Sequence, residues 1–382
     1  MLTVELQSEG KHRASVRRLG ELDWDFPAQF SESAYSTLHW HPCRFPSQIP
    51  AITIGRLTQP GDIVLDPFMG SATTLVEAQR LGRRSVGVDI NPISCMIAEA
   101  KTLTLSGDDV RRYVDGLKLA LAKDWHSLKC GVVAQSVQVQ KWYMPNTLVD
   151  LCKLWGLVQD YNSHAKPIGL SAFSSILLGA CRETRHWGYV CDNTTPQSER
   201  ATDVRGLFLS ALQKFAAAYH ERDNELHDDV REATVRQGDA CTILQQYPEN
   251  YFSCVVTSPP YFGVADYVKA QRLSMEWFGF EIEPFRQQEI GARSKRHRKD
   301  AESSYIQDTR IVFTEVFRTL KRGGYAIIVV GQSPKRNDIL EIYVNVLCEI
   351  GFTLELERRR QIPTSRRQMP SLADEVVLVL RK

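Results

Sequence analysis

The tetrapeptide Ser-Pro-Pro-Tyr at residues 258–261 brings together groups that could hold a flat, polar ring. Residues 254–257, just before it, are apolar and mostly β-branched, which predicts a short buried strand. The prolines cannot continue a hydrogen-bond ladder, so they end the strand and stiffen its tip. This tip suits a planar heterocycle with an exocyclic amino group, because its hydroxyl and carbonyl oxygens can accept N–H hydrogens while Tyr261 stacks on the ring. A plain Pro-Pro turn after a strand is the alternative.

Two stretches upstream predict a site for a nucleoside. Residues 61–74, GDIVLDPFMGSATT, indicate a strand that ends at Asp66, a turn of small residues and then a helix. Such a turn points backbone N–H groups and a helix N-terminus at a ligand. Residues 85–88 indicate a second strand, which ends in Asp89. An acidic residue roughly 20 positions after a glycine turn is where a nucleoside-binding fold holds ribose hydroxyls.

In this order, the three stretches resemble the S-adenosylmethionine-dependent amino-methyltransferases of DNA, and SPPY resembles their cytosine-N4 branch. The resemblance implies an α/β fold with a doubly wound, mostly parallel, seven-stranded sheet of the Rossmann-like methyltransferase kind, and the periodicity described below adds a helical insert. It implies S-adenosylmethionine as the cofactor and double-stranded DNA as a partner. A cognate restriction endonuclease would be a possible second partner.

The resemblance assigns cofactor contacts to residues near the predicted strand ends. An HPxxxP stretch, here His41, Pro42 and Pro46, is expected at the methionine end of the cofactor. Asp239 is expected to accept from the adenine amino group, although capping a helix is an alternative role for it. The predicted cofactor-binding residues are Pro42, Asp66, Pro67, Phe68, Gly70, Ser71, Thr73, Asp89, Ile90, Asn91, Asp239 and Ala240.

One position departs from the family pattern. The family usually reads GSGTT where this chain has Ala72 in GSATT. The extra methyl group is tolerable if the backbone φ angle of Ala72 is negative and costs more if that angle is positive.

The implied reaction is methyl transfer to the exocyclic N4 of a cytosine that has been flipped out of the duplex. The lone pair of this nitrogen is delocalised into the ring, so acceptors on its hydrogens and in-line placement of both reactants are needed. The predicted catalytic residues are Ser258, Pro259, Pro260 and Tyr261. Transfer to cytosine C5 is disfavoured because it would need a cysteine nucleophile in this loop, and the nearest one, Cys254, lies within the strand.

Three other activities share parts of this pattern. Adenine-N6 DNA methyltransferases have the same pocket features, although they more often carry Asp or Asn where Ser258 stands. An RNA amino-methyltransferase would need an RNA-binding appendage. A DNA-binding regulator that holds the cofactor without turnover would have no need of an unchanged SPPY tetrapeptide.

Two basic tracts, residues 286–299 and 358–367, are candidates for phosphate contact. Solvated charged faces are the alternative. The predicted DNA-binding residues are Arg293, Lys295, Arg296, Arg298, Arg366 and Arg367.

Net charge, cysteine content and hydropathy limit the kinds of partner and compartment that this protein can have. The 382 residues carry a net charge of only +2, so an anionic partner must be met by local patches. Nine cysteines without CxxC pairs argue against a zinc site or a disulfide framework and suit a reducing compartment. No stretch predicts a signal peptide or a membrane span, so we expect a cytoplasmic protein without a metal or a membrane partner.

The hydrophobic periodicity changes along the chain, and these changes predict how the chain divides into domains. Residues 1–35 are expected to be a partly ordered arm, 36–105 the cofactor half of the methyltransferase domain and 231–382 its catalytic half. Residues 106–230 predict a helical insert that could recognise DNA, because about 125 residues are too many for a loop. Helices are expected at residues 108–126, 147–161, 169–182 and 202–226.

Overall fold

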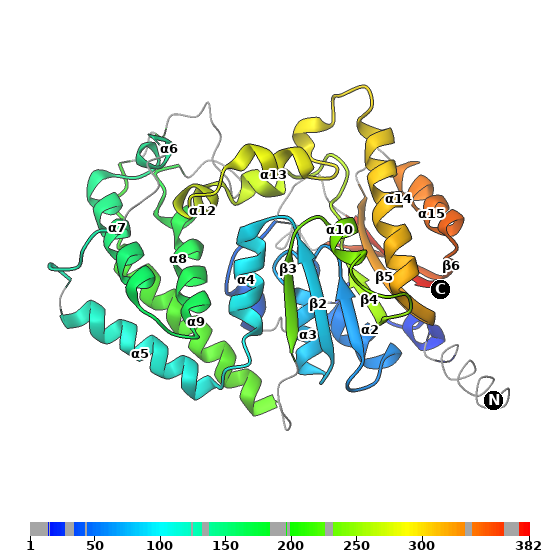
Figure 1. The fold of residues 1–382 in the computed structure, drawn as a ribbon, viewed down its shortest axis with the longest axis horizontal. Coiled ribbons are helices and arrows are strands. Elements are labelled where there is room, and N and C mark those ends of the chain that lie inside the picture. Colours follow the sequence, from blue (N-terminus) through cyan, green and yellow to red (C-terminus); the bar gives the residue numbers. More distant parts are fainter. Residues whose placement is uncertain are drawn as a thin grey trace.

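A seven-stranded sheet with the order β3-β2-β1-β4-β5-β7-β6 forms the centre of the computed structural model (Figure 1). The structure describes residues 14, 16–26, 34–42, 44–123, 125–131, 137–183, 196, 199–225, 232–332, 338–362 and 374–382. The strands are β1 (Ile63–Asp66), β2 (Arg84–Asp89), β3 (Ala233–Gln237), β4 (Phe252–Thr257), β5 (Leu320–Gln332), β6 (Thr353–Gln361) and β7 (Asp374–Arg381). Strand β7 runs antiparallel to both neighbours, and the other pairs are parallel. This confirms the predicted fold class.

Helices cover both faces of the sheet, so the central strands are buried on two sides. On one face α2 (Gln48–Leu57), α3 (Thr73–Arg80) and α4 (Pro92–Thr102) pack on the strands, and on the other α10 (Ala240–Leu244), α14 (Ala301–Thr319) and α15 (Asp338–Ile350) do so. Neighbouring residues of one strand therefore enter different cores. Val256 belongs to the first core and Val255 to the second. This explains the continuous apolar runs that predicted the strands.

The helices of the insert pack in a hydrophobic core that Val76 of α3 and Ala100 of α4 also join. These helices are α5 (Gly107–Lys123), α6 (Val137–Lys141), α7 (Pro145–Asp160), α8 (Lys166–Ala180) and α9 (Val204–Glu225), which lie on the left in Figure 1. Their buried side chains include Trp142, Phe173 and Phe215, and Trp277 joins them from a later segment. Helices appear where the 3–4 spacing predicted them. The assignment of the insert to DNA recognition stays a prediction.

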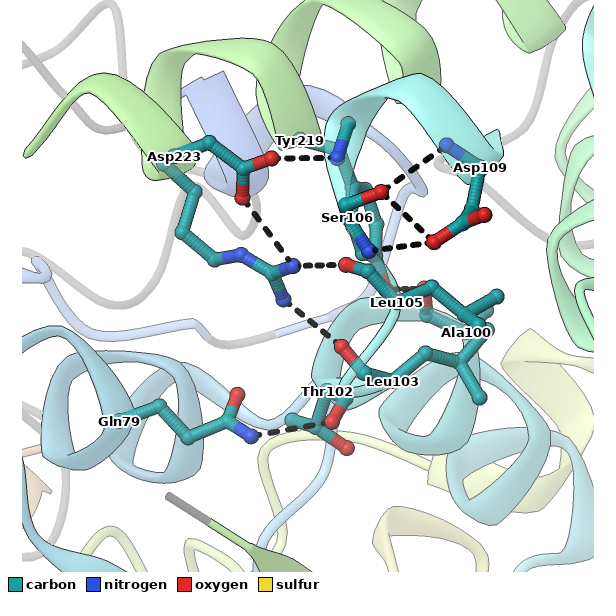
Figure 2. A network of polar contacts seen from close by, with 11 residues as sticks. Gln79, Ala100, Thr102, Leu103, Leu105, Ser106, Asp109, Tyr219 and Asp223 are labelled. Carbon is teal, nitrogen blue, oxygen red and sulfur yellow. Dashed lines mark hydrogen bonds and ion pairs between the residues drawn. The ribbon is translucent and has the colours of Figure 1, made fainter. Parts of the chain in front are cut away.

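A polar network fastens the insert to α4 (Figure 2). The guanidinium of Arg222 in α9 donates to the carbonyl oxygen of Leu103 at 2.7 Å and also to that of Leu105. The Tyr219 hydroxyl donates to the carbonyl of Ala100 at 2.8 Å. Carbonyl groups at a helix end lack partners within the helix, so these side chains satisfy them and fix where the chain leaves α4.

Part of the N-terminal region is packed against the strands. Leu19, Trp24 and Phe26 are buried in the core beside α2. Arg358 of β6 donates to the carbonyl of Gly20 at 3.0 Å, and Arg360 donates from Nε to that of Trp24 at 3.0 Å. These two arginines of the second basic tract therefore bind protein carbonyls.

Short helices between β4 and α14 were not predicted from the sequence. They are α11 (Tyr267–Ala270), α12 (Arg272–Trp277), α13 (Ile282–Gln288) and the 3₁₀ turn η2 (Arg293–Lys295), and a further turn, η1 (Ala34–Thr37), lies near the N-terminus. The sequence between β4 and α14 is a polar, basic stretch without a clear hydrophobic periodicity. Among the described residues, no helix is both long and apolar enough to cross a membrane.

Candidate active site

A cavity opens at the carboxyl ends of β1, β2, β3 and β4, where open α/β sheets bind ligands. Its empty space, open solvent included, is roughly 920 Å³. The predicted residues that line it are Pro42, Pro67, Phe68, Gly70, Ser71, Thr73, Asp89, Ile90, Asn91, Asp239, Ala240, Ser258 and Pro260. Asp66, Pro259 and Tyr261 are not among its lining residues.

Asp89 ends β2 and is held by the turn that follows β1. Its Oδ2 accepts from the backbone N–H of Gly70 at 3.0 Å, and its Oδ1 accepts from that of Asn91 at 2.8 Å. Burial raises the pKa of Asp89 to about 6, against the lowering effect of these two bonds. A carboxylate has further lone pairs, so Asp89 can also accept from a ligand hydroxyl.

Gly70 is required by both its backbone and its surroundings. Its φ angle is +46°, and a Cβ atom placed there would lie 3.0 Å from Cε1 of His41. His41 is itself fixed, because its Nδ1 donates to the Pro42 carbonyl at 2.9 Å and its Nε2 lies 3.3 Å from the Ser94 hydroxyl. Burial lowers the pKa of His41 to about 3, so the ring is neutral at pH 7. The HPxxxP stretch therefore packs on the glycine turn.

Ala72, the position that departs from the family pattern, has a φ angle of +66° and is fully buried. Because this φ angle is positive, the methyl group of Ala72 carries the higher of the two costs considered from the sequence. A left-handed conformation costs a non-glycine residue roughly 1–2 kcal/mol.

We expect Ala72→Gly to leave the free energy of unfolding within about 1 kcal/mol of wild type, because two effects oppose each other. Relief of strain gains roughly 1–2 kcal/mol. Loss of a buried methyl group and greater freedom of the unfolded chain cost roughly 1–2 kcal/mol together. Ala78→Gly is the matched control, since Ala78 is buried within α3 and has no such strain. It should cost roughly 1–2 kcal/mol in denaturant unfolding. Equal losses in both variants would contradict the strain at Ala72.

Asp66 connects the first turn to the SPPY strand. Its Oδ1 accepts from the Thr257 hydroxyl at 2.6 Å and from the Phe68 backbone N–H at 3.1 Å. Burial raises the pKa of Asp66 to about 6. In addition, the Thr74 hydroxyl donates to the carbonyl of Val256 at 3.0 Å. These bonds set the position of Ser258 relative to the glycine turn.

The SPPY segment is held tightly on several sides. The Ser258 hydroxyl donates to the Tyr261 hydroxyl at 2.9 Å, and the Pro260 carbonyl accepts from the Tyr305 hydroxyl at 3.1 Å. The Tyr261 ring is only 1% exposed and packs with Val264 and Ile362. Stacking of this ring on a base, as predicted, therefore requires its cover to move.

Several lining residues were not predicted from the sequence, among them Tyr267, Gln288, Glu289 and Ile290. Glu289 accepts from the backbone N–H groups of Tyr267 and Val268. Burial raises the pKa of Glu289 to about 7. The signal that could have found it is its place as the single acid in the basic tract of residues 286–299.

The first basic tract divides into buried and exposed parts. The Lys295 ammonium donates to the carbonyls of Gln287 and Glu289 at 2.8 and 2.7 Å, so it braces the loop beside the cavity. Arg296 donates to the carbonyl of Arg293 at 2.9 Å, and both side chains are half-buried. Arg298 is exposed. The DNA-binding roles stay predictions, and Arg366 and Arg367 lie outside the described residues.

The chemistry of the cavity fits S-adenosylmethionine. Apolar side chains of Phe68, Ile90 and Ala240 offer surface to a purine, and the Asp89 carboxylate offers an acceptor for ribose hydroxyls. Asp239 caps α10 by accepting from the Thr242 backbone N–H at 2.9 Å. It lines the same cavity, so the capping role and an adenine contact are compatible. No group of three His, Cys, Asp or Glu residues in the described part of the chain could hold a metal ion.

Comparison with known proteins agrees with this geometry. The family model of the N6/N4 DNA methylases matches residues 5–100. The type II methyltransferase M.MjaII of Methanocaldococcus jannaschii is 22% identical over 92% of this chain and 82% of its own length. M.MvaI of Kocuria varians is 23% identical over 57% of this chain and 51% of its own. The DNA adenine methyltransferase YhdJ of Escherichia coli is 41% identical over 69 residues, which are 18% of this chain and 22% of its own.

The matched residues 5–100 include the HPxxxP stretch, the glycine turn and Asp89. These are the parts that build one side of the cavity, and the M.MjaII match extends over most of the remaining chain. The chain is therefore similar to the N6/N4 DNA methylases in the parts that build the cavity, and to type II methyltransferases over most of its length.

Proposed function

We propose that this protein is a DNA methyltransferase that transfers a methyl group to the exocyclic N4 of cytosine in double-stranded DNA. The observation that carries the proposal is the placement of Ser258, a neutral hydroxyl, in the same cavity as Asp89 and Asp239. S-adenosylmethionine supplies an activated methyl group when it is bound. The residues of the chain bind and orient both reactants.

The first task of the chain is to hold the cofactor. Asp89 accepts from ribose hydroxyls, and Asp239 accepts from the adenine amino group. The glycine turn lines the cavity, and Gly70 lets it pack against His41, because a Cβ atom there would lie 3.0 Å from Cε1 of that ring. These residues would hold the cofactor in the cavity that Ser258 also lines.

The second task is to activate a weak nucleophile. The Ser258 oxygen accepts one hydrogen of the target amino group, which favours a localised lone pair and stabilises charge that develops on nitrogen. The second hydrogen is assigned to the Pro259 carbonyl; Pro259 does not line the cavity, so this contact requires the carbonyl to become accessible when the base enters. Holding this nitrogen in line with the methyl group removes much of the entropic barrier. The base must leave the duplex to reach this position.

Transfer to adenine N6 is the second candidate. It is favoured by the match to the DNA adenine methyltransferase of Escherichia coli, which reaches 41% identity over 69 residues. Both reactions use an exocyclic amino group, so the same acceptors would serve either base.

The test is to incubate the purified chain with isotope-labelled S-adenosylmethionine and DNAs of varied sequence, and then to identify the modified nucleoside. N4-methylcytosine is the expected product. N6-methyladenine alone would overturn the cytosine assignment and keep the family. A product on RNA alone, or cofactor binding without turnover on any nucleic acid, would overturn the proposed function.

We also propose that the loop after β4 and the helical insert face the duplex. Neutralising the exposed Arg298 and Lys299 together should weaken binding to all DNA sequences alike and lower the slope of log affinity against log salt by up to about two units. Titrations at several salt concentrations measure both. The matched control is Arg84→Ala with Arg322→Ala, two exposed cations at the amino ends of β2 and β5, on the opposite edge of the sheet. An effect on cognate DNA alone would instead mean that the tract reads bases.

The relatives M.MjaII and M.MvaI are type II methyltransferases, which supports a place in restriction and modification and a cognate endonuclease as partner. We place the protein in the cytoplasm with the DNA that it would modify. The free cysteines found among the described residues agree with a reducing compartment.

A further inference from the structure

A chain of hydrogen bonds runs from the SPPY segment into the C-terminal hairpin of β6 and β7. The Ser258 hydroxyl donates to the Tyr261 hydroxyl at 2.9 Å, which in turn donates to Oε1 of Glu375 at 3.1 Å. The other carboxylate oxygen of Glu375 accepts from the guanidinium of Arg360. Arg360 also donates from Nε to the carbonyl of Trp24 at 3.0 Å. One series of hydrogen bonds thus links the SPPY segment, the C-terminal hairpin and the N-terminal region at Trp24.

The buried side chains of this hydrogen-bonded series determine which group donates and which accepts in each bond. The exposed fractions are 1% for Tyr261, 2% for Glu375 and 2% for Arg360, so water does not compete for these bonds. An ionised carboxylate can only accept, and the Arg360 guanidinium can only donate. Burial raises the pKa of Glu375, and the Arg360 guanidinium opposes this shift and favours the ionised form. With Glu375 ionised, the Tyr261 hydroxyl donates to it and accepts from the Ser258 hydroxyl.

The consequence falls on the lone pairs of Ser258. A serine hydroxyl can donate or accept, and one that donated into the cavity would face the amino hydrogens of the target base. With its proton committed to Tyr261, Ser258 presents only lone pairs to the cavity that it lines. Preorganisation of this kind avoids the cost of reorienting the hydroxyl during the reaction.

We propose that Glu375 and Arg360 are positioning residues that act through Tyr261 to hold the Ser258 hydroxyl as a pure acceptor for the target amino group. This inference rests on the proposed methyl transfer. It assigns a role to two residues of the terminal hairpin that touch neither the cofactor nor the base. It also gives the Tyr261 hydroxyl a role separate from that of its ring.

Stability alone gives a weaker account of the pair. A buried ion pair often contributes little net stability, because desolvation offsets the attraction between its charges. The hairpin strands β6 and β7 are already joined over their length by backbone pairing and an apolar core. The Arg360–Glu375 pair is better explained by the Tyr261 hydroxyl that it holds in place.

The experiment compares Tyr261→Phe, Glu375→Gln and the double variant in single-turnover methyl transfer. Phenylalanine keeps the ring but breaks the chain, and glutamine removes the charge that fixes its direction. Each single variant should slow transfer roughly 10- to 100-fold, with affinities for cofactor and DNA within about twofold of wild type. If the two residues act through one chain, the double variant should be about as slow as the slower single variant. The proposal would be overturned if the rate losses of the two single variants multiplied in the double variant. It would also be overturned if the variants lost cofactor affinity and kept the transfer rate.

The matched control is Glu276→Gln, which removes the charge from another buried ion pair, Arg272–Glu276, with a 2.7 Å contact. It should lower the melting temperature as Glu375→Gln does but keep the transfer rate. If Glu375→Gln fails to fold, Tyr261→Phe leaves the ion pair intact, and an unchanged rate in that variant overturns the proposal by itself. A wild-type protein that methylates no DNA overturns the proposed function. Active wild type with unchanged variants overturns only the positioning role.

Discussion

Ser258→Ala should slow methyl transfer roughly 10²–10³-fold while cofactor affinity stays within about twofold of wild type. The variant removes one of two acceptors for the charge that develops on the target nitrogen. It should not disturb the glycine turn, because Asp66 is bonded to Thr257 and not to Ser258. Single-turnover rates at saturating DNA measure the first effect, and calorimetry of cofactor binding measures the second.

The same strand offers a matched control. Ser253 lies at the amino end of β4, where its hydroxyl donates to Asp62 at 2.7 Å, on the edge of the sheet opposite the cavity. Ser253→Ala should keep the transfer rate. A rate for Ser258→Ala close to that of wild type would falsify the role of the Ser258 hydroxyl as an acceptor.

Asp89→Ala should weaken cofactor binding by roughly 1.5–3 kcal/mol, through the loss of charge-assisted hydrogen bonds to the ribose. Part of this loss would come from the turn itself, because Asp89 also holds the backbone N–H groups of Gly70 and Asn91. Calorimetry gives the affinity, and the melting temperature without cofactor reports the contribution of the turn. Unchanged affinity would contradict the assignment.

The raised pKa of Asp89 adds a dependence on pH. The ribose hydroxyls donate to the ionised carboxylate, so binding should be full well above pH 6 and should weaken as the pH falls through about 6. Two other carboxyl groups titrate near this range. Asp66, whose pKa is also about 6, does not line the cavity, and Glu289, which lines it with a pKa of about 7, is bonded to the backbone N–H groups of Tyr267 and Val268. Asp89→Asn should therefore flatten most of the change in affinity between pH 7 and pH 5, whereas Asp66→Asn should leave most of it. The reverse pattern would assign the titration to Asp66.

The sheet and the long helices could be predicted because local patterns determine them. The run at residues 254–257 is β-branched and apolar, and it lies in a strand buried on both faces. Asp66 and Asp89 follow such runs, and parallel strands bring their carboxyl ends to one edge of the sheet. The cavity could be assembled from this rule without knowledge of distant contacts.

The features that escaped prediction depend on contacts between distant residues. Tyr261 was expected to be an open aromatic face, but its cover comes from the terminal hairpin, and its partner Glu375 lies 114 positions away. Lys295 donates to two carbonyl groups that border the cavity, which the sequence did not indicate, and its contact with phosphate stays a prediction. The positive φ angle of Ala72 likewise follows from how the turn packs. Side-chain type alone does not encode such partners.

The predicted role of the insert in DNA recognition gives the network around Arg222 a further consequence. The chain leaves the sheet at the end of α4 and returns at the start of β3, both on the edge opposite the cavity, since α4 runs back from the carboxyl end of β2. Arg222 fastens the insert at this junction, far in the chain from the cofactor turn and from SPPY. An insert of different sequence that kept these few bonds could be exchanged as a cassette. New specificity could then evolve, or be engineered, without disturbing the residues that bind the cofactor.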